Sequence, residues 1–257
     1  MRLQLSTWPE VERYLDTSKG VIIPVGSTEQ HGPTGFIGTD ALCPEILAYG
    51  LSEKRAAENN PVMIAPTLSI GMAQHHLGFA GSVTLRPSTM IAMVQDVVNS
   101  LAKHGFERFF FLNGHGGNIA TLNAAFSEIY AEHSLGRVGD NRPPVRCTLV
   151  NWFDCKSVMK ISAEQFGDDD GAHATCGEVS LTYYGFQKDA ARVKDAEMAA
   201  GRAGDGPIFD CDDYRRRFPD GRIGSDPRKA TIEAGELLYN AAIDEIGTRY
   251  DTFLGAA

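Results

Sequence analysis

The chain has 257 residues, of which 43% are hydrophobic and 22% are charged, with a net charge of −9 at pH 7. These values are ordinary for a globular enzyme, and an acidic balance argues against a nucleic-acid partner, which needs a basic face. The N-terminus lacks the apolar core of a signal peptide, no apolar run approaches the roughly 20 residues of a membrane span, and the five cysteines show no paired spacing. We therefore expect a cytoplasmic protein with reduced thiols and no membrane partner.

Apolar runs alternate with helical apolar spacing along the first part of the chain. The runs predict strands at residues 21–25, 62–66, 108–112 and 145–152. The intervening helices are predicted by three sets of apolar residues: Leu42, Ile46 and Leu47; Ile91, Val94, Val98 and Leu101; Ile119, Leu122, Phe126 and Ile129. This alternation predicts an α/β fold, a three-layer α/β/α sandwich with a central, mostly parallel sheet.

The second part of the chain is less regular. A helix is predicted at 178–184, after the acidic segment 167–171. Residues 195–227 are rich in Gly, Asp, Arg and Pro, which predicts mostly surface loops. An amphipathic helix is predicted at 230–250. No repeat, low-complexity tract or clear linker is present, so we expect a single domain over residues 1–257.

Four potential metal ligands follow two of the predicted strands. Glu29 and His31 come after the first strand and His115 after the third, while Asp40 lies just before the first helix. In an open α/β sheet, ligands gather beyond the carboxyl ends of the strands, so these side chains can meet in space. Each also has a structural alternative: a polar turn for Glu29 and His31, a helix cap for Asp40, and a tight turn or phosphate loop for His115.

A mixture of imidazole and carboxylate ligands suits zinc, manganese or iron better than calcium or magnesium. A bridging carboxylate can hold two metals about 3.5–4 Å apart, an arrangement that activates water for hydrolysis. Asp40 is our candidate bridge, because an imidazole cannot bridge in this way. We therefore expect two divalent metals in each subunit.

Further candidates are two catalytic residues, His173 and Glu178. On one continuous helix, two residues five positions apart would lie on different faces. His173 must therefore precede the helix if both side chains face one site. The acidic residues 168–170 would raise the pKa of His173 and keep a proton available near neutrality. The alternatives are a surface histidine and a carboxylate in the first turn of a helix.

The substrate-binding candidates are His76, Gly116, Gly117 and Trp152. His76 is adjacent to His75, and such pairs in loops often point apart, so His76 is assigned to a substrate pocket rather than to a metal. The two glycines leave the pocket open. Trp152, at the end of a predicted strand, would stack on a planar substrate or belong to the core.

The chain resembles the creatininase (creatinine amidohydrolase) family in motifs that occur in family order from about residue 20 to residue 235. They are GSTEQHG at 26–32, TD at 39–40, GFAGSVTL at 78–85, NGHGGN at 113–118, HA at 173–174 with Glu178, and GSDPRKAT at 224–231. The resemblance implies an α/β/α fold and a metal-dependent hydrolase of small molecules that is often a hexamer. Carried over by position, it implies that Glu29, His31, Asp40 and His115 are metal ligands, that Asp40 bridges, and that His173 handles protons.

The chain departs from the creatinine-hydrolysing branch at the second metal. In that branch an aromatic residue and a glutamate follow the histidine that matches His115, whereas Gly116 and Gly117 stand here. The glutamate ligates the second metal, so Glu178, water or substrate must complete that site here, or the site is weak. A tryptophan of that branch, four residues before the proton-handling histidine, is replaced by Asp169. The creatinine pocket is therefore not reproduced.

The function predicted from the sequence is hydrolysis of a C–N bond in an amide or cyclic amide by metal-activated water. The NGHGGN form is similar to family branches that act on other substrates, including a formamide deformylase of flavin and deazaflavin biosynthesis and a peptide-processing hydrolase of redox-cofactor maturation. A formamide or another small carbonyl compound is therefore the alternative substrate. The non-enzymatic alternative is a metal- or nucleotide-binding protein that uses the turn at 114–117.

Overall fold

The computed structural model describes residues 1–136, 144–198 and 206–256. Its sheet has three parallel strands in the order β1 (Gly20–Val25), β2 (Arg108–Asn113) and β3 (Arg146–Asn151). The helices of the described residues are α1 (Trp8–Leu15), α2 (Thr39–Ala57), α3 (Pro87–Lys103), α4 (Ile119–Ser134), α5 (Lys156–Phe166), α6 (Cys176–Gly185), α7 (Gln187–Ala190), α8 (Cys211–Arg217) and α9 (Ile232–Gly255). Among these residues, no helix has the length and apolar content needed to cross a membrane.

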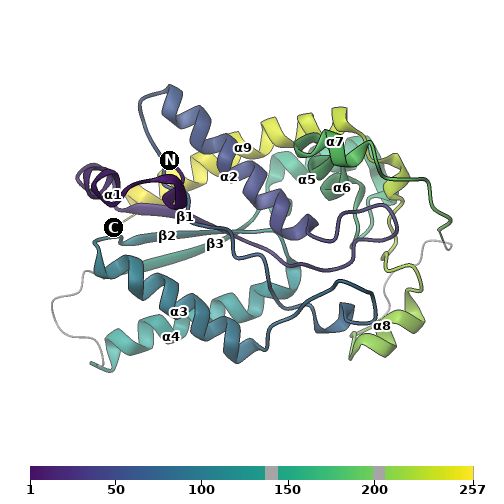
Figure 1. Ribbon diagram of the computed structural model, residues 1–257, viewed down its shortest axis with the longest axis horizontal. Helices are drawn as coiled ribbons and strands as arrows, with labels where there is room; N and C mark the ends of the chain where they lie inside the picture. Colours follow the sequence, from purple (N-terminus) through teal and green to yellow (C-terminus); the bar gives the residue numbers. More distant parts are fainter. Residues whose placement is uncertain (137–143, 199–205, 257) are drawn as a thin grey trace.

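Helices cover both faces of the sheet, which confirms the predicted α/β class and layer order (Figure 1). Alternate strand residues point to opposite faces. Ile22 and Phe110 pack in a core with α2, α5, α6 and α9, whereas Val21 and Phe109 pack in a second core with α1, α3 and α4. Because both faces are covered, β1 and residues 109–112 of β2 are continuous apolar runs, whereas β3 mixes polar and apolar residues.

The predicted strand at 62–66 is wrong as a member of the sheet. Ile64 forms only isolated bridges, to Ile22 and to Arg2, although the segment is buried beside β1. The Ile22 N–H donates to the Met63 oxygen and the Ala65 N–H donates to the Ile22 oxygen, but Pro24 has no N–H with which to continue the ladder. The other three predicted strands are present at nearly the expected positions.

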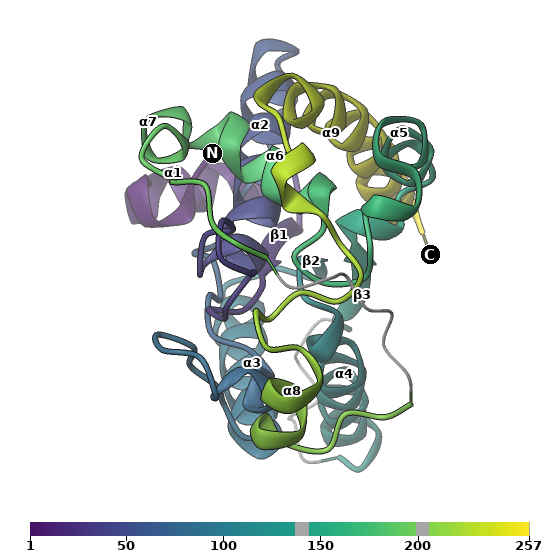
Figure 2. The ribbon, with the colours of Figure 1, turned by 90° about the vertical axis from the view of Figure 1, so that its right-hand side faces the viewer.

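Most of the described residues in 195–227 are loops and turns, as predicted, but the range also contains a helix. Residues 199–205 lie outside the described residues, but α8 forms at Cys211–Arg217, capped by the side chain of Asp210, which accepts a hydrogen bond from the backbone N–H of Asp213. Figures 1 and 2 show α8 on the side of the molecule toward which the strands run. The segment that carries α8 therefore reaches the same end of the sheet as the predicted metal ligands.

Helix α5 was not anticipated. Its first turn is capped from another element: the Glu245 carboxylate in α9 accepts hydrogen bonds from the backbone N–H groups of Lys156 and Ser157 and from the Ser157 hydroxyl. A cap supplied by a residue so distant in sequence leaves no local start signal.

Candidate metal centre

Two glycines let the loops after β1 and β2 close onto the first turn of α2. A Cβ atom on Gly26 would lie 2.1 Å from the backbone oxygen of Asp40, and one on Gly114 would lie 2.0 Å from the same oxygen. Real Cβ atoms do not approach so closely, so only glycine permits this packing. Because both loops contact the helix at Asp40, the polar residues that follow each strand converge there.

The four predicted metal ligands lie together and are buried. Nε2 of His31 lies 3.0 Å from Oδ1 of Asp40, and Nδ1 of His115 lies 3.0 Å from Oδ2 of the same carboxylate. Nε2 of His115 lies 3.3 Å from Oε2 of Glu29, whose side chain is fully buried. Asp40 therefore stands between two imidazoles and can offer one oxygen to each side.

Carboxylate oxygens of this cluster are left without hydrogen bonds. Both side-chain oxygens of Glu29 and Oδ2 of Asp40 are buried and have no partner of hydrogen-bond geometry. Leaving such oxygens unsatisfied is costly unless a cation neutralises them. Ligand atoms of Glu29, His31 and Asp40 all lie within 4.8 Å of one another. The donor set and its unsatisfied oxygens fit a divalent cation of the zinc, manganese or iron type.

The charges at the site perturb one another strongly. Burial alone would raise the pKa of Asp40, but the two flanking imidazoles hold it well below its usual value. Burial alone would lower the pKa values of His31 and His115, but the nearby carboxylates raise them to about 10 and about 9. Burial, reinforced by Asp40, raises the pKa of Glu29. The carboxylates thus attract positive charge, and a metal would displace protons from both histidines.

A second group of potential ligands adjoins the first. His31, His173 and Glu178 bring ligand atoms within 4.8 Å of one another, and Nε2 of His31 lies 3.8 Å from Oε1 of Glu178. A Cβ atom on Gly117 would meet the ring of His115 instead, 2.4 Å from its Nε2, and the backbone oxygen of Met72 at 2.8 Å. Glu178 is the carboxylate of this second group.

Glu178 also has a structural role at the start of α6. Its Oε1 accepts a hydrogen bond from the backbone N–H of Thr175 at 2.6 Å, and the Thr175 hydroxyl accepts one from the N–H of Glu178. This is a capping box. It begins the helix after His173, so His173 and Glu178 face one cavity although they are five residues apart. Burial, together with Asp40, raises the pKa of Glu178 to about 7, although His31 opposes the shift.

His173 lies at the cluster, but the predicted cause and direction of its pKa shift are wrong. Burial and two neighbouring histidines lower its pKa well below the usual value. Within the acidic segment 168–170, Asp169 forms an ion pair with Lys229 instead. The sequence neighbours of His173 therefore do not determine its charge; the buried cluster does.

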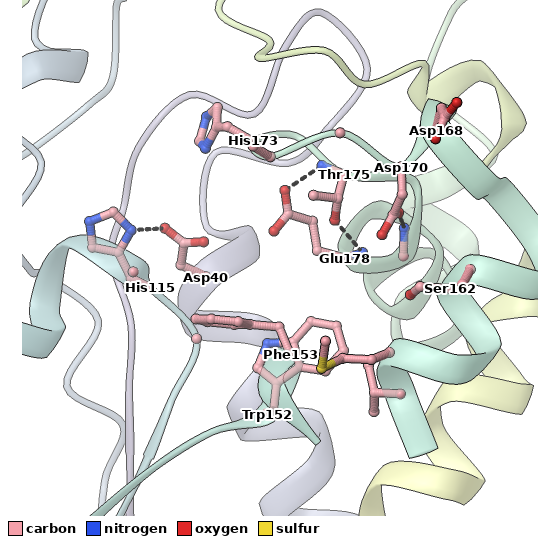
Figure 3. A pocket seen from close by; sticks show the side chains of 18 of the residues that line it. Asp40, His115, Trp152, Phe153, Ser162, Asp168, Asp170, His173, Thr175 and Glu178 are labelled. Carbon is pink, nitrogen blue, oxygen red and sulfur yellow. Dashed lines mark hydrogen bonds and ion pairs between the residues drawn. The ribbon is translucent and has the colours of Figure 1, made fainter. Parts of the chain in front are cut away.

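A cavity of 570 Å³ opens beside the cluster (Figure 3). Trp152 and Phe153 lie on one side, and His173, Thr175 and Glu178 lie on the other. Trp152 is also part of the apolar core, so both interpretations of this residue hold.

The remaining predicted substrate residues divide by position. Gly116 lines the cavity, as Trp152 does, whereas Gly117 and His76 are not among its lining residues. His76 belongs to the buried cluster instead, with Nε2 3.0 Å from Oε1 of Glu29. Burial and two other histidines lower its pKa to about 3.

Sequence reasoning missed two buried residues of the site. Gln30 lies between Glu29 and His31, and its amide contacts both His76 and His173. Its place within the GSTEQHG motif is a signal that could have found it. Tyr214, in α8, packs edge-on against His76 with ring centroids 4.6 Å apart and is fully buried. No local pattern in 195–227 marks this tyrosine.

Comparison with known proteins shows which family the chain belongs to. The family model described as creatinine amidohydrolase matches residues 4–249. The chain belongs to the creatininase family. It is 29% identical over 251 residues to a creatinine amidohydrolase of Pseudomonas putida, covering 93% of this chain and 92% of that protein. This creatininase-family member also superposes on a crystal structure of creatinine amidohydrolase with a TM-score of 0.80 at 22% identity, over 100% of this chain and 98% of the other.

Another relative carries a different function. The chain is 32% identical over 121 residues to a mycofactocin precursor peptide peptidase of Mycobacterium tuberculosis (strain CDC 1551 / Oshkosh), covering 45% of this chain. The match spans about half the length of that relative, 48%. The predicted family and fold are confirmed, and the family's members support the predicted class of hydrolase.

Proposed function

We propose that this creatininase-family protein is a metal-dependent hydrolase that cleaves the C–N bond of an amide. The observation that carries the proposal is the buried cluster of Glu29, His31, Asp40 and His115, with carboxylate oxygens that lack hydrogen-bond partners. The relatives support the proposal, because one is named a creatinine amidohydrolase and another a precursor peptide peptidase, and both names denote hydrolysis of a C–N bond.

Two cations per chain fit the residues best. Glu29, Asp40 and His115 would hold one, and Asp40, His31 and Glu178 the other. Solved creatininase structures include a manganese form and a zinc form, which supports a metal of this kind. When bound, such metals polarise a carbonyl group and lower the pKa of water so that it can attack.

The chain's own residues supply positioning and proton transfer. His173 faces the cavity beside Glu178, and with Glu178 held as a ligand, His173 is the residue proposed to give a proton to the leaving nitrogen. Trp152 and Phe153 form an apolar side that packs on the substrate and excludes water. Asp40 keeps its negative charge at neutral pH and so holds the positive charge of the centre in place.

The substrate is proposed to be larger than creatinine. The cavity of 570 Å³ falls in the range of about 300–1,000 Å³ that is typical of sites for drug-sized ligands. Gly116 leaves the side nearest His115 open, because a Cβ atom on this glycine would meet no atom of a more distant residue within 4 Å. An amide within a peptide, or a formamide on a larger molecule, fits this space. We also propose a cytoplasmic homo-oligomer, a hexamer if the resemblance extends to assembly.

Metal analysis combined with a substrate panel tests the proposal. Purified protein should contain stoichiometric zinc, manganese or iron and should hydrolyse at least one member of a panel of lactams, formamides and short peptides, but creatinine poorly. Chelation should abolish the activity and added metal should restore it. A protein that binds no metal, or that binds a nucleotide at the turn 114–117 and hydrolyses nothing, would support the non-enzymatic alternative.

A further inference from the structure

The amide of Gln30 is held by two backbone groups of fixed polarity. Its Oε1 accepts a hydrogen bond from the backbone N–H of Gly32 at 2.9 Å, and its Nε2 donates to the backbone oxygen of Gly221 at 2.9 Å. A flipped amide would set oxygen against oxygen and N–H against N–H at these two contacts. The side chain is buried, so water cannot relieve such a clash. The orientation of the Gln30 amide is therefore determined.

This orientation places the amide nitrogen of Gln30 beside two imidazoles. Nε2 of Gln30 lies 2.8 Å from Nδ1 of His76 and 2.9 Å from Nε2 of His173. The same ring atom of His173 also lies 2.8 Å from the backbone oxygen of Gln30, which can only accept. The two amide hydrogens of Gln30 thus face four neighbouring acceptor positions, counting the Gly221 oxygen and the more distant Tyr214 hydroxyl at 3.4 Å.

One assignment of hydrogens leaves no lone pair facing a lone pair. The amide hydrogens go to Gly221 and to Nδ1 of His76, and Nε2–H of His173 donates to the Gln30 backbone oxygen. Giving an amide hydrogen to His173 instead would leave its bare Nε2 against that oxygen at 2.8 Å. It would also leave Nδ1 of His76 with no donor unless it were protonated against an N–H group.

We infer that Gln30 fixes His76 as the Nε2–H tautomer, so that His76 lies beside Glu29 with an N–H group rather than a lone pair and is not a metal ligand. A ligating nitrogen must present a lone pair, but Nε2 of His76, 3.0 Å from Oε1 of Glu29, carries the hydrogen. Ligand atoms of His76, Glu29 and His173 lie close enough to share a metal, but His76 cannot act as a ligand in this tautomer.

The same network gives His173 the opposite role. With its hydrogen on Nε2, His173 has a bare Nδ1, which lies 4.0 Å from Oε1 of Glu29 on the side of the carboxylate cluster. His76 thus presents a donor to the cluster and His173 an acceptor. Tyr214 supports the arrangement, because its hydroxyl donates to the Gly221 oxygen at 2.6 Å and holds the loop that orients the amide. The consequence for metal binding rests on the proposed function, but the tautomers do not.

Long-range ¹H–¹⁵N correlation spectra of the metal-free, full-length protein measure the tautomers directly. The chain has seven histidines, and the signals of His76 are identified by their loss in His76→Gln. Wild-type protein should show His76 protonated on Nε2, and Gln30→Glu, which has no N–H to donate, should shift the hydrogen to Nδ1. His75→Gln, the adjacent control, should leave His76 unchanged. An Nδ1–H tautomer in the wild type, or no change in Gln30→Glu, overturns the inference even if the protein proves to bind metal.

Zinc titration provides the second measurement. At saturating zinc, His76→Gln should bind as many ions per chain as the wild type, with affinity about 10- to 100-fold weaker because a residue beside a proposed ligand has been changed. Loss of one ion per chain in His76→Gln would make His76 a ligand and overturn the inference. If the wild type itself binds no zinc, the proposed function fails, while the spectra still decide the tautomer.

Discussion

The two walls of the candidate site are built in different ways. The strand wall consists of residues that follow β1 and β2, with Asp40 at the start of α2; the loop wall consists of His173 before α6 and Tyr214 in α8. The strand wall is anchored by a buried parallel sheet and by glycines that touch the helix. The loop wall is anchored by hydrogen bonds from side chains to the backbone, such as that from Tyr214 to Gly221. Metal binding should therefore depend mainly on the first wall, and rate and loop stability on the second.

The largest expected effect is on the strand wall. Asp40→Ala should reduce bound metal from the wild-type stoichiometry to near zero and abolish hydrolysis, because Asp40 contacts both imidazoles and is assigned as the bridge. Metal content by atomic emission and circular dichroism on the same sample check this. Asp168→Asn, at the far end of the same cavity, is the control and should keep its metal. Full metal retention in Asp40→Ala would refute the bridging role.

On the loop wall, His173→Ala should retain metal and fold but lower kcat by about 10²- to 10⁴-fold, the usual loss for a missing general acid or base. The reason is that its imidazole lies at the cluster with a ring nitrogen toward Glu29. Steady-state kinetics and metal analysis on one preparation separate the possibilities. An unchanged kcat would exclude His173 from the mechanism. Loss of metal would show that His173 is a metal ligand.

Tyr214 tests whether α8 is part of the same folded unit. Tyr214→Ala should lower the free energy of unfolding by about 3–5 kcal/mol, because a fully buried ring is lost. Tyr214→Phe should cost only about 0.5–1.5 kcal/mol, since the Gly221 oxygen keeps its bond from Gln30. Urea unfolding measures both. Equal losses in the two variants would mean that the hydroxyl, not the ring, holds α8 in place.

The smallest effect lies outside both walls, at the cap of α5. Partial burial would raise the pKa of Glu245, but hydrogen bonds from Ser157, Arg249 and Lys156 lower it to about 2. A lowered pKa means that the carboxylate stabilises the fold above its ordinary value near 4.5, and that this stability is lost as the pH falls from about 4.5 toward 2.

Glu245→Gln should therefore be less stable than wild type by about 0.5–2 kcal/mol at pH 7, the usual range for a helix cap. The difference should shrink through that acidic range, with metal content unaffected at pH 7. Unfolding curves at several pH values decide this, and a difference that is constant with pH would exclude the charge of Glu245 as the cause.

Sequence reasoning worked best where structure is determined locally. The apolar runs of β1 and β2 are buried on both faces, and residues directly after such strands are brought together by any parallel sheet, so Glu29 and His115 could be predicted to meet. His76 and Tyr214 could not, because their positions depend on contacts between distant segments, and Gln30 was overlooked inside a recognised motif. The missing strand at 62–66 shows a further limit: apolar content predicts burial, but Pro24 interrupts the hydrogen bonding.

Gly117 limits how this protein could evolve toward the creatinine-hydrolysing branch, which by resemblance has a glutamate there. Any side chain at this position begins with a Cβ atom 2.4 Å from the ring of His115 and 2.8 Å from the Met72 backbone oxygen. Gly117→Glu would thus displace the imidazole of His115, which is proposed as a ligand, before it could offer a new carboxylate. A single substitution at Gly117 would therefore disturb the position of His115. A backbone shift near Met72 would have to come first.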